Sequence, residues 1–153
     1  MGGVGRIQQR WGFVRQIPII VDKINIRLSG GLQMSRYGEA AVKAERKRLP
    51  GKKLTPVEAW EWAINQSSLS DSSKKKCCPK LAYVGLCESK KVVSSEKSKN
   101  KRYAREAVRI LRKTRPSSAA ALWRQVTANL KCKGLTHNGQ MDVVLALKDA
   151  GYI

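Results

Sequence analysis

The cysteines and the single histidine are the residues here with the best chemistry for holding a metal ion. A zinc site could be built from Cys78, Cys87, Cys132 and His137. Eight residues separate the first two of these ligands, and four residues separate the last two. Structural zinc sites instead use short spacings in both pairs of ligands, and the first pair here is too far apart. We therefore expect no metal and no cofactor, and a buried, inert pair of cysteines is the interpretation that we favour.

A nuclease site of the Asp…Glu-x-Lys type would use Asp71, Glu88 and Lys90. That pattern often arises by chance, and Glu88 falls at the end of a predicted helix, whereas such sites lie on strands. Glycine-rich phosphate loops, the zinc-protease helix motif and dinucleotide fingerprints are absent. One histidine and 11 acids leave little material for acid–base catalysis. We expect a protein that is not an enzyme.

Positive charge dominates the composition. The 153 residues include 31 Lys and Arg, and the net charge is +20, of which residues 34–153 contribute +16. A chain this basic repels itself unless a polyanion neutralises it. Nucleic acid is the first expected partner, and an acidic protein is the second.

The densest row of positive charge is predicted on a helix over residues 101–113. Four arginines follow one another at spacings of three, four and three residues: Arg102, Arg105, Arg109 and Arg112. At about 100° per residue they fall within about 80° of arc, opposite an apolar face that includes Tyr103 and Leu111. A weaker row follows residue 36: Lys43, Arg46 and Lys47. Like charges this close repel one another, so we predict polyanion binding; an ordinary solvated face is the alternative.

Lysines also crowd the predicted starts of two later helices. Those near residue 78 are Lys74, Lys75, Lys76 and Lys80, and those before residue 138 are Lys131 and Lys133. Cations at a helix start oppose the helix dipole unless an anion binds there. Asn138 and Gln140 have amides of the kind that pair with adenine, so both are candidate contacts to base edges. The alternative for Asn138 is a plain N-cap.

The helices that position these residues form two related halves. Three blocks of sequence occur once in each half. The pattern Tyr-x-x-x-Ala-Val recurs after 66 residues, and a Trp five residues after Ser or Thr recurs after 63. Residues 85–92 align with residues 146–153, an offset of 61. Helices are predicted over 36–47, 55–65 and 78–89, then over 101–113, 117–129 and 138–150, with a polar loop over 66–76. The predicted fold is all-α, with two tandem three-helix, helix-turn-helix-like units from an internal duplication, over 34–93 and 101–153, joined by a linker over 94–100.

Residues 1–33 differ from the rest of the chain. They contain half of the 12 glycines and five basic residues against one acid. Gly30-Gly31 must be encoded GGN-GGN, six nucleotides before Met34, and GGAGGN at that distance from ATG is a bacterial ribosome-binding site. We interpret residues 1–33 as a translated leader, and a flexible basic arm that binds nucleic acid is the alternative.

Three segments resemble a small bacterial family of unknown function. They are residues 37–44 (YGEAAVKA), 78–88 (CPKLAYVGLCE) and 138–147 (NGQMDVVLAL), and the resemblance extends over residues 34–153. It implies a bacterial origin and supports the boundary at Met34, and it implies no activity.

Together these features predict a cytoplasmic, non-catalytic protein that binds nucleic acid, DNA rather than RNA, mainly through phosphate contacts. No secretory signal or membrane-spanning run is visible, so no membrane partner is expected. The alternative is a protein–protein interaction module, an adaptor or antitoxin-like protein that binds an acidic partner.

Overall fold

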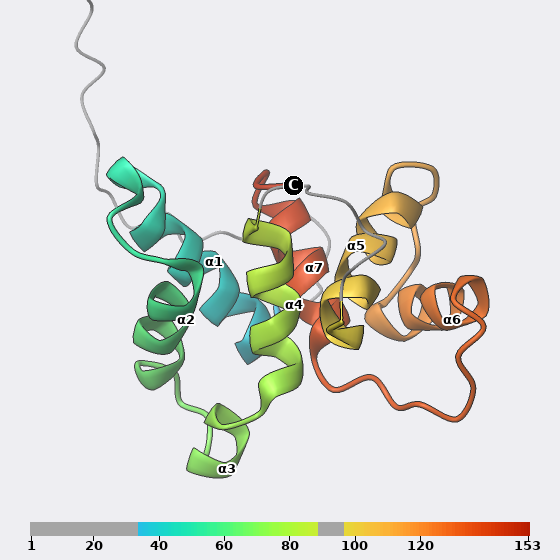
Figure 1. Ribbon diagram of the computed structural model, residues 1–153, viewed down its shortest axis with the longest axis horizontal. Helices are drawn as coiled ribbons and strands as arrows, with labels where there is room; N and C mark the ends of the chain where they lie inside the picture. The colour runs from blue at the N-terminus through green and yellow to red at the C-terminus, as the bar shows by residue number, and fades with distance from the viewer. Residues whose placement is uncertain (1–33, 89–96) are drawn as a thin grey trace, which may run out of the picture. The chain divides into compact units, whose positions relative to one another are not determined.

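The computed structural model describes residues 34–88 and 97–153 (Figure 1). Every regular element in these two ranges is helical, which confirms the predicted all-α fold class. The described residues belong to one compact unit. The predicted leader or basic arm, residues 1–33, lies outside the described residues.

The first two long helices each begin at a residue whose side chain caps the helix. Helix α1 spans Arg36–Arg48, and the Ser35 hydroxyl accepts the Gly38 N–H at its start. After a 3-10 turn, η1 (Pro50–Lys52), helix α2 spans Pro56–Asn65. Thr55 and Glu58 form a capping box, in which each side chain accepts the other residue's backbone N–H.

The predicted polar loop over residues 66–76 contains a short helix that sequence reasoning missed. Helix α3 spans Asp71–Lys74, and Ser70 caps it by accepting the Ser73 N–H. None of its residues is buried, so no apolar periodicity marks it in the sequence. Helix α4 follows over Cys77–Cys87, close to the predicted position.

The second half of the chain contains three helices, as predicted. Helix α5 spans Lys99–Leu111 and begins inside the segment predicted as a linker. Helix α6 spans Ala119–Asn129 and is capped by Ser118, and helix α7 spans Gln140–Asp149. The N-cap of α7 is Gly139, with φ 85°, and Asn138 precedes it. The N-cap reading of Asn138 was therefore wrong by one residue, because the cap requires a left-handed backbone that glycine adopts without strain.

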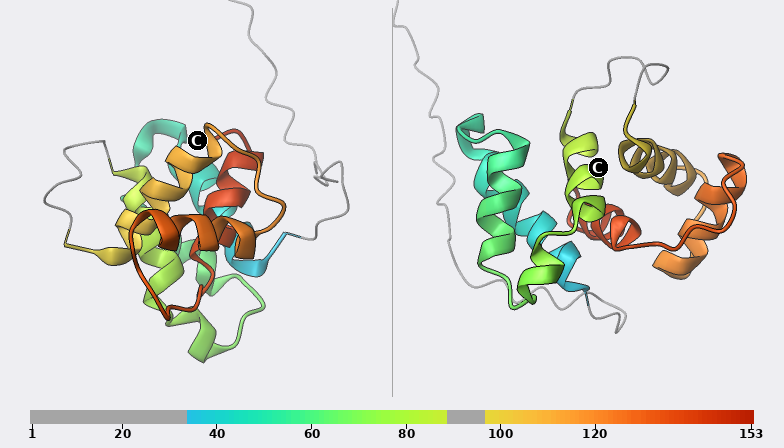
Figure 2. Two further views of the ribbon diagram at one scale, coloured as in Figure 1. Left: turned by 90° about the vertical axis from the view of Figure 1, so that its right-hand side faces the viewer. Right: turned by 60° about the horizontal axis from the view of Figure 1, so that its bottom comes forward.

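The two halves interlock through their last helices. Helix α4 packs against α5, helix α7 packs against α1, and α4 and α7 also contact each other between these pairs (Figures 1 and 2). The last helix of each half therefore covers the first helix of the other half. One apolar cluster includes residues from both halves, among them Trp60, Tyr83, Trp123 and Met141. The duplication itself stays a prediction, although the same exchange of helices occurs twice.

Small residues allow the two exchanged helix pairs to approach closely. A Cβ atom on Gly38 of α1 would lie 2.8 Å from the Cβ of Ala146 on α7. A Cβ atom on Gly85 of α4 would lie 2.8 Å from the Cβ of Lys101 on α5. In the predicted repeat, Gly85 aligns with Ala146, so the two interfaces use small residues at matching positions.

Enlarging Gly38 is expected to separate α1 from α7. The substitution Gly38→Leu should lower the free energy of unfolding by about 2 kcal/mol, because its side chain meets Ala146 and the Asp142 carbonyl with no room to relax. Urea unfolding followed by circular dichroism measures the change. Ala128→Leu, on an exposed position of α6, is the matched control and should shift stability by less than about 0.5 kcal/mol. An unchanged midpoint in Gly38→Leu would contradict the close contact.

Candidate nucleic-acid interface

A basic groove lies between the start of α5 and the connection from α6 to α7. We call it the α5 groove; its volume is about 300 Å³, and it is lined by Lys99, Arg102, Tyr103, Leu130, Cys132, Lys133 and Leu135. Three of these seven residues are basic and none is acidic. Lys99, Arg102 and Lys133 are exposed, and none forms an ion pair with another residue in the described ranges. Their positive charge is therefore not compensated within that part of the chain.

Hydrogen bonds hold the connection that forms the far wall of this groove. Lys131 has φ 54°, which turns the chain after α6, and the Cys132 N–H donates to the Thr127 carbonyl at 2.8 Å. The indole N–H of Trp123 donates to the Leu135 carbonyl at 3.1 Å. These bonds fix Lys133 opposite the first turn of α5.

A second groove, the α4 groove, lies beside the α3–α4 connection and has a volume of about 510 Å³. It gathers the four lysines predicted near this helix start, Lys74, Lys75, Lys76 and Lys80. Unlike the α5 groove, it also contains two acids, Glu61 and Asp71, and the Lys80 ammonium lies 2.7 Å from a Glu61 carboxylate oxygen. Its positive charge is thus partly compensated.

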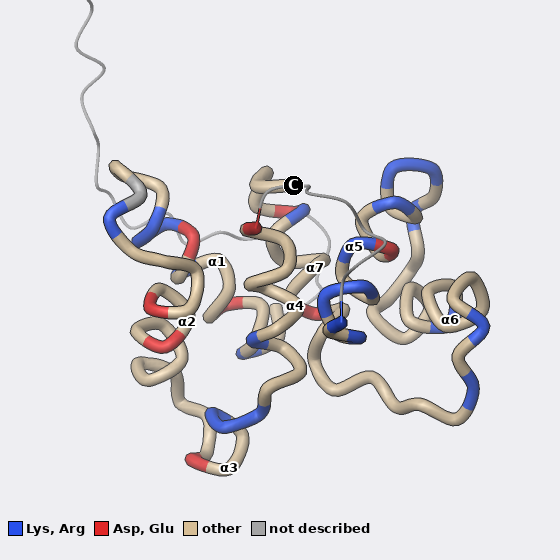
Figure 3. The backbone as a smooth tube through the Cα atoms, viewed as in Figure 1, with Lys and Arg blue, Asp and Glu red and all other residues tan. Residues whose placement is uncertain are grey.

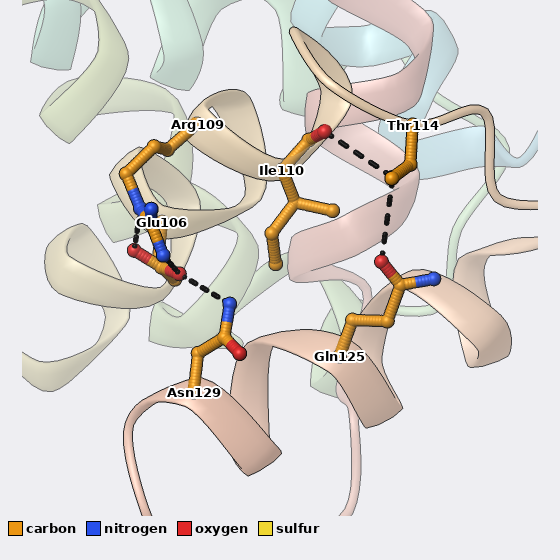
Figure 4. A network of polar contacts seen from close by, with 6 residues as sticks. All are labelled: Glu106, Arg109, Ile110, Thr114, Gln125 and Asn129. Carbon is orange, nitrogen blue, oxygen red and sulfur yellow. Dashed lines mark hydrogen bonds and ion pairs between the residues drawn. The ribbon is translucent and has the colours of Figure 1, made fainter.

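The predicted arginine row on α5 does not act as one uniform face. Arg102 and Arg112 are exposed. Arg109 forms a two-pronged ion pair with Glu106, with distances of 2.6 and 2.8 Å (Figure 4). Arg105 is half-buried and donates from Nε to the Gly85 carbonyl of α4 at 3.3 Å. Two of the four predicted phosphate contacts therefore already have protein partners.

Glu106 also ties α6 to α5. Its carboxylate accepts a hydrogen bond from the Asn129 amide at 2.8 Å, and one turn earlier on α6 the Gln125 Oε1 accepts a hydrogen bond from the Thr114 hydroxyl at 3.4 Å (Figure 4). The hydrogen bond from Arg109 is the largest influence on Glu106 and lowers the pKa of that carboxyl. Glu106 therefore stays ionised and orients Arg109.

The weaker row on α1 surrounds a tryptophan that sequence reasoning had not considered. The ammonium groups of Lys43 and Lys47 lie 5.5 and 5.2 Å from the centre of the Trp62 ring, within cation–π range. Arg46, which precedes Lys47 in the sequence, is exposed to solvent. The apolar stems of both lysines thus have a surface to pack on, and this row is a weaker candidate for phosphate binding.

Of the two predicted contacts to base edges, only Asn138 is accessible. Gln140 is 2% exposed, and its amide donates to Asn100 Oδ1 at 3.0 Å and accepts the Asn138 N–H at 2.6 Å. The structure therefore contradicts Gln140 as a base contact, because its side chain is buried and its donor and acceptor are both used. Asn138 is exposed, and its role stays a prediction.

The other chemistry considered from the sequence is not assembled. Asp71 starts α3, whereas Glu88 follows the far end of α4, and Lys90 lies outside the described residues. Cys87 donates to Glu45 and Cys132 lies against the Tyr103 hydroxyl, so the cysteines have separate surroundings. Within residues 34–88 and 97–153, no three His, Cys, Asp or Glu side chains gather as metal ligands.

A buried ion pair that the sequence had not indicated lies at the end of α1. Glu45 accepts two hydrogen bonds from Arg48, at 2.6 and 3.0 Å, one from the Tyr83 hydroxyl at 2.9 Å and one from the Cys87 thiol at 3.4 Å. Burial by itself would raise the pKa of Glu45, but the bonds from Arg48 and Tyr83 outweigh it and leave this pKa lowered. Burial, and next the nearby Glu45 charge, raises the pKa of Cys87 to about 12.

Figure 3 shows where the positive charge lies on the fold. Lys and Arg occur in the α3–α4 connection, at the start of α5 and in the α6–α7 connection, all in the lower half of the view. The turn after α5, which includes Arg112 and Arg115, lies in the upper half. The two grooves therefore belong to the lower half, and Arg112 does not line either of them. None of the described helices is long and apolar enough to cross a bilayer.

Comparison with known protein families identifies the family of this chain. The model that matches residues 34–153 is described as a family of unknown function, DUF6979. The chain belongs to this family, and the match covers the same residues as the resemblance seen in the sequence. Neither the curated proteins nor the solved structures gave a match to this chain.

Proposed function

We propose that this protein binds nucleic acid without catalysis, chiefly through phosphate contacts in the α5 groove. The observation that supports this most strongly is the set of three exposed cations, Lys99, Arg102 and Lys133, in a groove with no lining acid. The α4 groove adds Lys74, Lys75 and Lys76 as further phosphate contacts.

The free-energy cost of holding cations at the start of α5 is lowest when an anion is bound there. Helix α5 has no acid in its first turn, and Lys99 and Arg102 stand near its positive dipole end, whereas Lys101 is paired with Glu88 at 2.7 Å. Each of these charges opposes the helix dipole, and like charges at such spacings repel one another. A phosphate at the groove would remove both penalties and release condensed counterions from the nucleic acid.

We infer a cytoplasmic, bacterial setting, with DNA as the first substrate to test. The four cysteines are free thiols, which suits a reducing compartment. A protein–protein interaction module for an acidic partner is the second candidate. The observation that favours it is the positive charge outside both grooves, in the turn after α5, together with exposed Leu49 and Val57.

The expected result of a salt titration is a steep loss of binding. Fluorescence anisotropy with labelled DNA and RNA should give a log–log slope of about −3 or steeper, because each neutralised phosphate contributes about −0.7 to −0.9. The triple variant Lys99→Gln, Arg102→Gln, Lys133→Gln should reduce the slope by about 2 to 3.

The matched control also removes three positive charges, but from positions outside the two grooves. Its substitutions, Lys53→Gln, Arg115→Gln and Arg124→Gln, are at exposed positions that line neither groove. It should change the slope by less than about 1. No binding at low salt, or equal losses in the two triple variants, would contradict the proposed interface.

A further inference from the structure

We infer that the α5 groove holds an unpaired nucleotide, so that single-stranded nucleic acid is the preferred ligand. This inference rests on the proposed function and narrows its substrate class. The groove combines two kinds of lining that a single strand would use together: cations for the phosphates, and an apolar surface for a base.

The apolar residues of the groove stand on the same two walls as its cations. One wall is α5, with Lys99, Arg102 and the edge of Tyr103, and the other is the α6–α7 connection, with Leu130, Lys133 and Leu135. Leu135 is 49% exposed, so its side chain is available to an incoming group. A base in the groove would contact Leu135 and Leu130, because Tyr103 is only 5% exposed, while the phosphates on either side of the base meet cations on both walls.

Duplex nucleic acid does not match this lining. In a duplex the faces of the bases are stacked, and a protein meets phosphates and the polar edges of the bases. The apolar part of the α5 groove would then lie against charged phosphates, which have no favourable contact with Leu135. The groove's volume of about 300 Å³ is also at the small end of ligand sites, which suits one nucleotide.

The groove needs little rearrangement to accept a base. The Trp123 indole N–H holds the Leu135 carbonyl at 3.1 Å, and the Tyr103 hydroxyl lies 3.9 Å from the Cys132 sulfur across the groove floor. Tyr103 is itself fixed edge-on against Trp123, with ring centres 5.0 Å apart. A preformed site avoids part of the entropy cost of ordering side chains on binding.

Three probes of equal length separate the base from the phosphates. The full-length protein is titrated at low salt against labelled oligothymidylate of about 12 nucleotides, an abasic strand with the same phosphates, and a duplex of the same length. Oligothymidylate should bind at least about fivefold more tightly than the abasic strand, because only the bases differ and one base contact contributes about 1 kcal/mol or more.

The variant Leu135→Ser removes the apolar contact and leaves all the charges. It should bring the affinities for oligothymidylate and the abasic strand to within about twofold of each other. Its backbone carbonyl still accepts from Trp123, so the fold is expected to persist, and thermal unfolding checks this. The control Leu49→Ser removes an equally exposed leucine from outside the groove and should keep the full difference.

Two failures can be told apart. If none of the three probes binds at low salt, the proposed function itself is wrong. If all three bind equally well, or if Leu135→Ser and Leu49→Ser retain the same preference for oligothymidylate, the protein binds phosphates and the inferred nucleotide site is wrong.

Discussion

Neither half of this chain is expected to fold alone. Cutting it between Val93 and Ser94 separates α1 from α7 and α4 from α5, the two exchanged helix pairs. Fragment 94–153 would then lack α1 and α4, so apolar side chains of α7 and α5 that these helices cover would be exposed to solvent. Exposing even two large, fully buried apolar side chains costs about 3 to 6 kcal/mol, which is comparable to the whole stability of a small domain.

Circular dichroism during urea unfolding tests this expectation on fragments 1–93 and 94–153. Each fragment alone should show low helicity and no cooperative transition, whereas coexpressed fragments should purify as an equimolar complex that unfolds cooperatively. The intact chain is the reference. A cooperative transition in either isolated fragment would show that the halves are independent tandem units, as the sequence pattern suggests.

Local features made most of the helices predictable. The Thr55-Pro56 cap with Glu58, the Ser118 cap and the apolar spacing on α5 each act within a few residues, so the sequence displays them directly. The short α3 has no buried residue and therefore no such pattern. The exchange of α4 and α7 between the halves is not local, and the repeat does not specify which copy of a helix packs on which.

The candidate site was also predictable in its local features and unpredictable in its long-range contacts. The lysines around α4 and α7 are visible as runs in the sequence, and the structure gathers many of them into two grooves. The pairing of Arg109 with Glu106 spans three residues and could have been anticipated from helix spacing. The burial of Gln140 could not, because its partner Asn100 precedes it by 40 residues on a different helix.

Removing the Glu45 carboxylate is expected to cause a large loss of stability from the substitution of a single polar residue. Glu45→Ala should lower the free energy of unfolding by about 3 kcal/mol, because it leaves the largely buried Arg48 charge unpaired and the buried Tyr83 hydroxyl without its acceptor. Glu45→Gln keeps an acceptor for Tyr83 and should cost less, about 1 to 2 kcal/mol.

Urea unfolding at neutral pH measures both losses. Glu61→Ala is the matched control, since it breaks the exposed ion pair with Lys80 and should cost less than about 1 kcal/mol. If Glu45→Ala were no more destabilising than Glu61→Ala, the buried network would contribute nothing beyond an ordinary surface pair.

The pH dependence of stability isolates the charge of Glu45 from its shape. Because folding lowers the pKa of Glu45, its contribution is present above the ordinary carboxyl pKa of about 4.3 and is lost as the pH falls further. The wild type should therefore lose more stability than Glu45→Gln on acidification below that pH. The remaining acid sensitivity of Glu45→Gln includes the part due to Glu106, whose pKa is also lowered.

The same network predicts the opposite behaviour in alkali. Folding raises the pKa of Cys87 to about 12, so the neutral thiol stabilises the fold below the ordinary thiol pKa, and this contribution is lost as the pH rises toward that value. Cys87→Ser should therefore lose less stability than the wild type between neutral pH and the alkaline end of that range. Equal losses would mean that the thiol is not held against the Glu45 charge. Together the acid and alkaline measurements test whether the charge of the buried Glu45 carboxylate, and not only its shape, stabilises the end of α1.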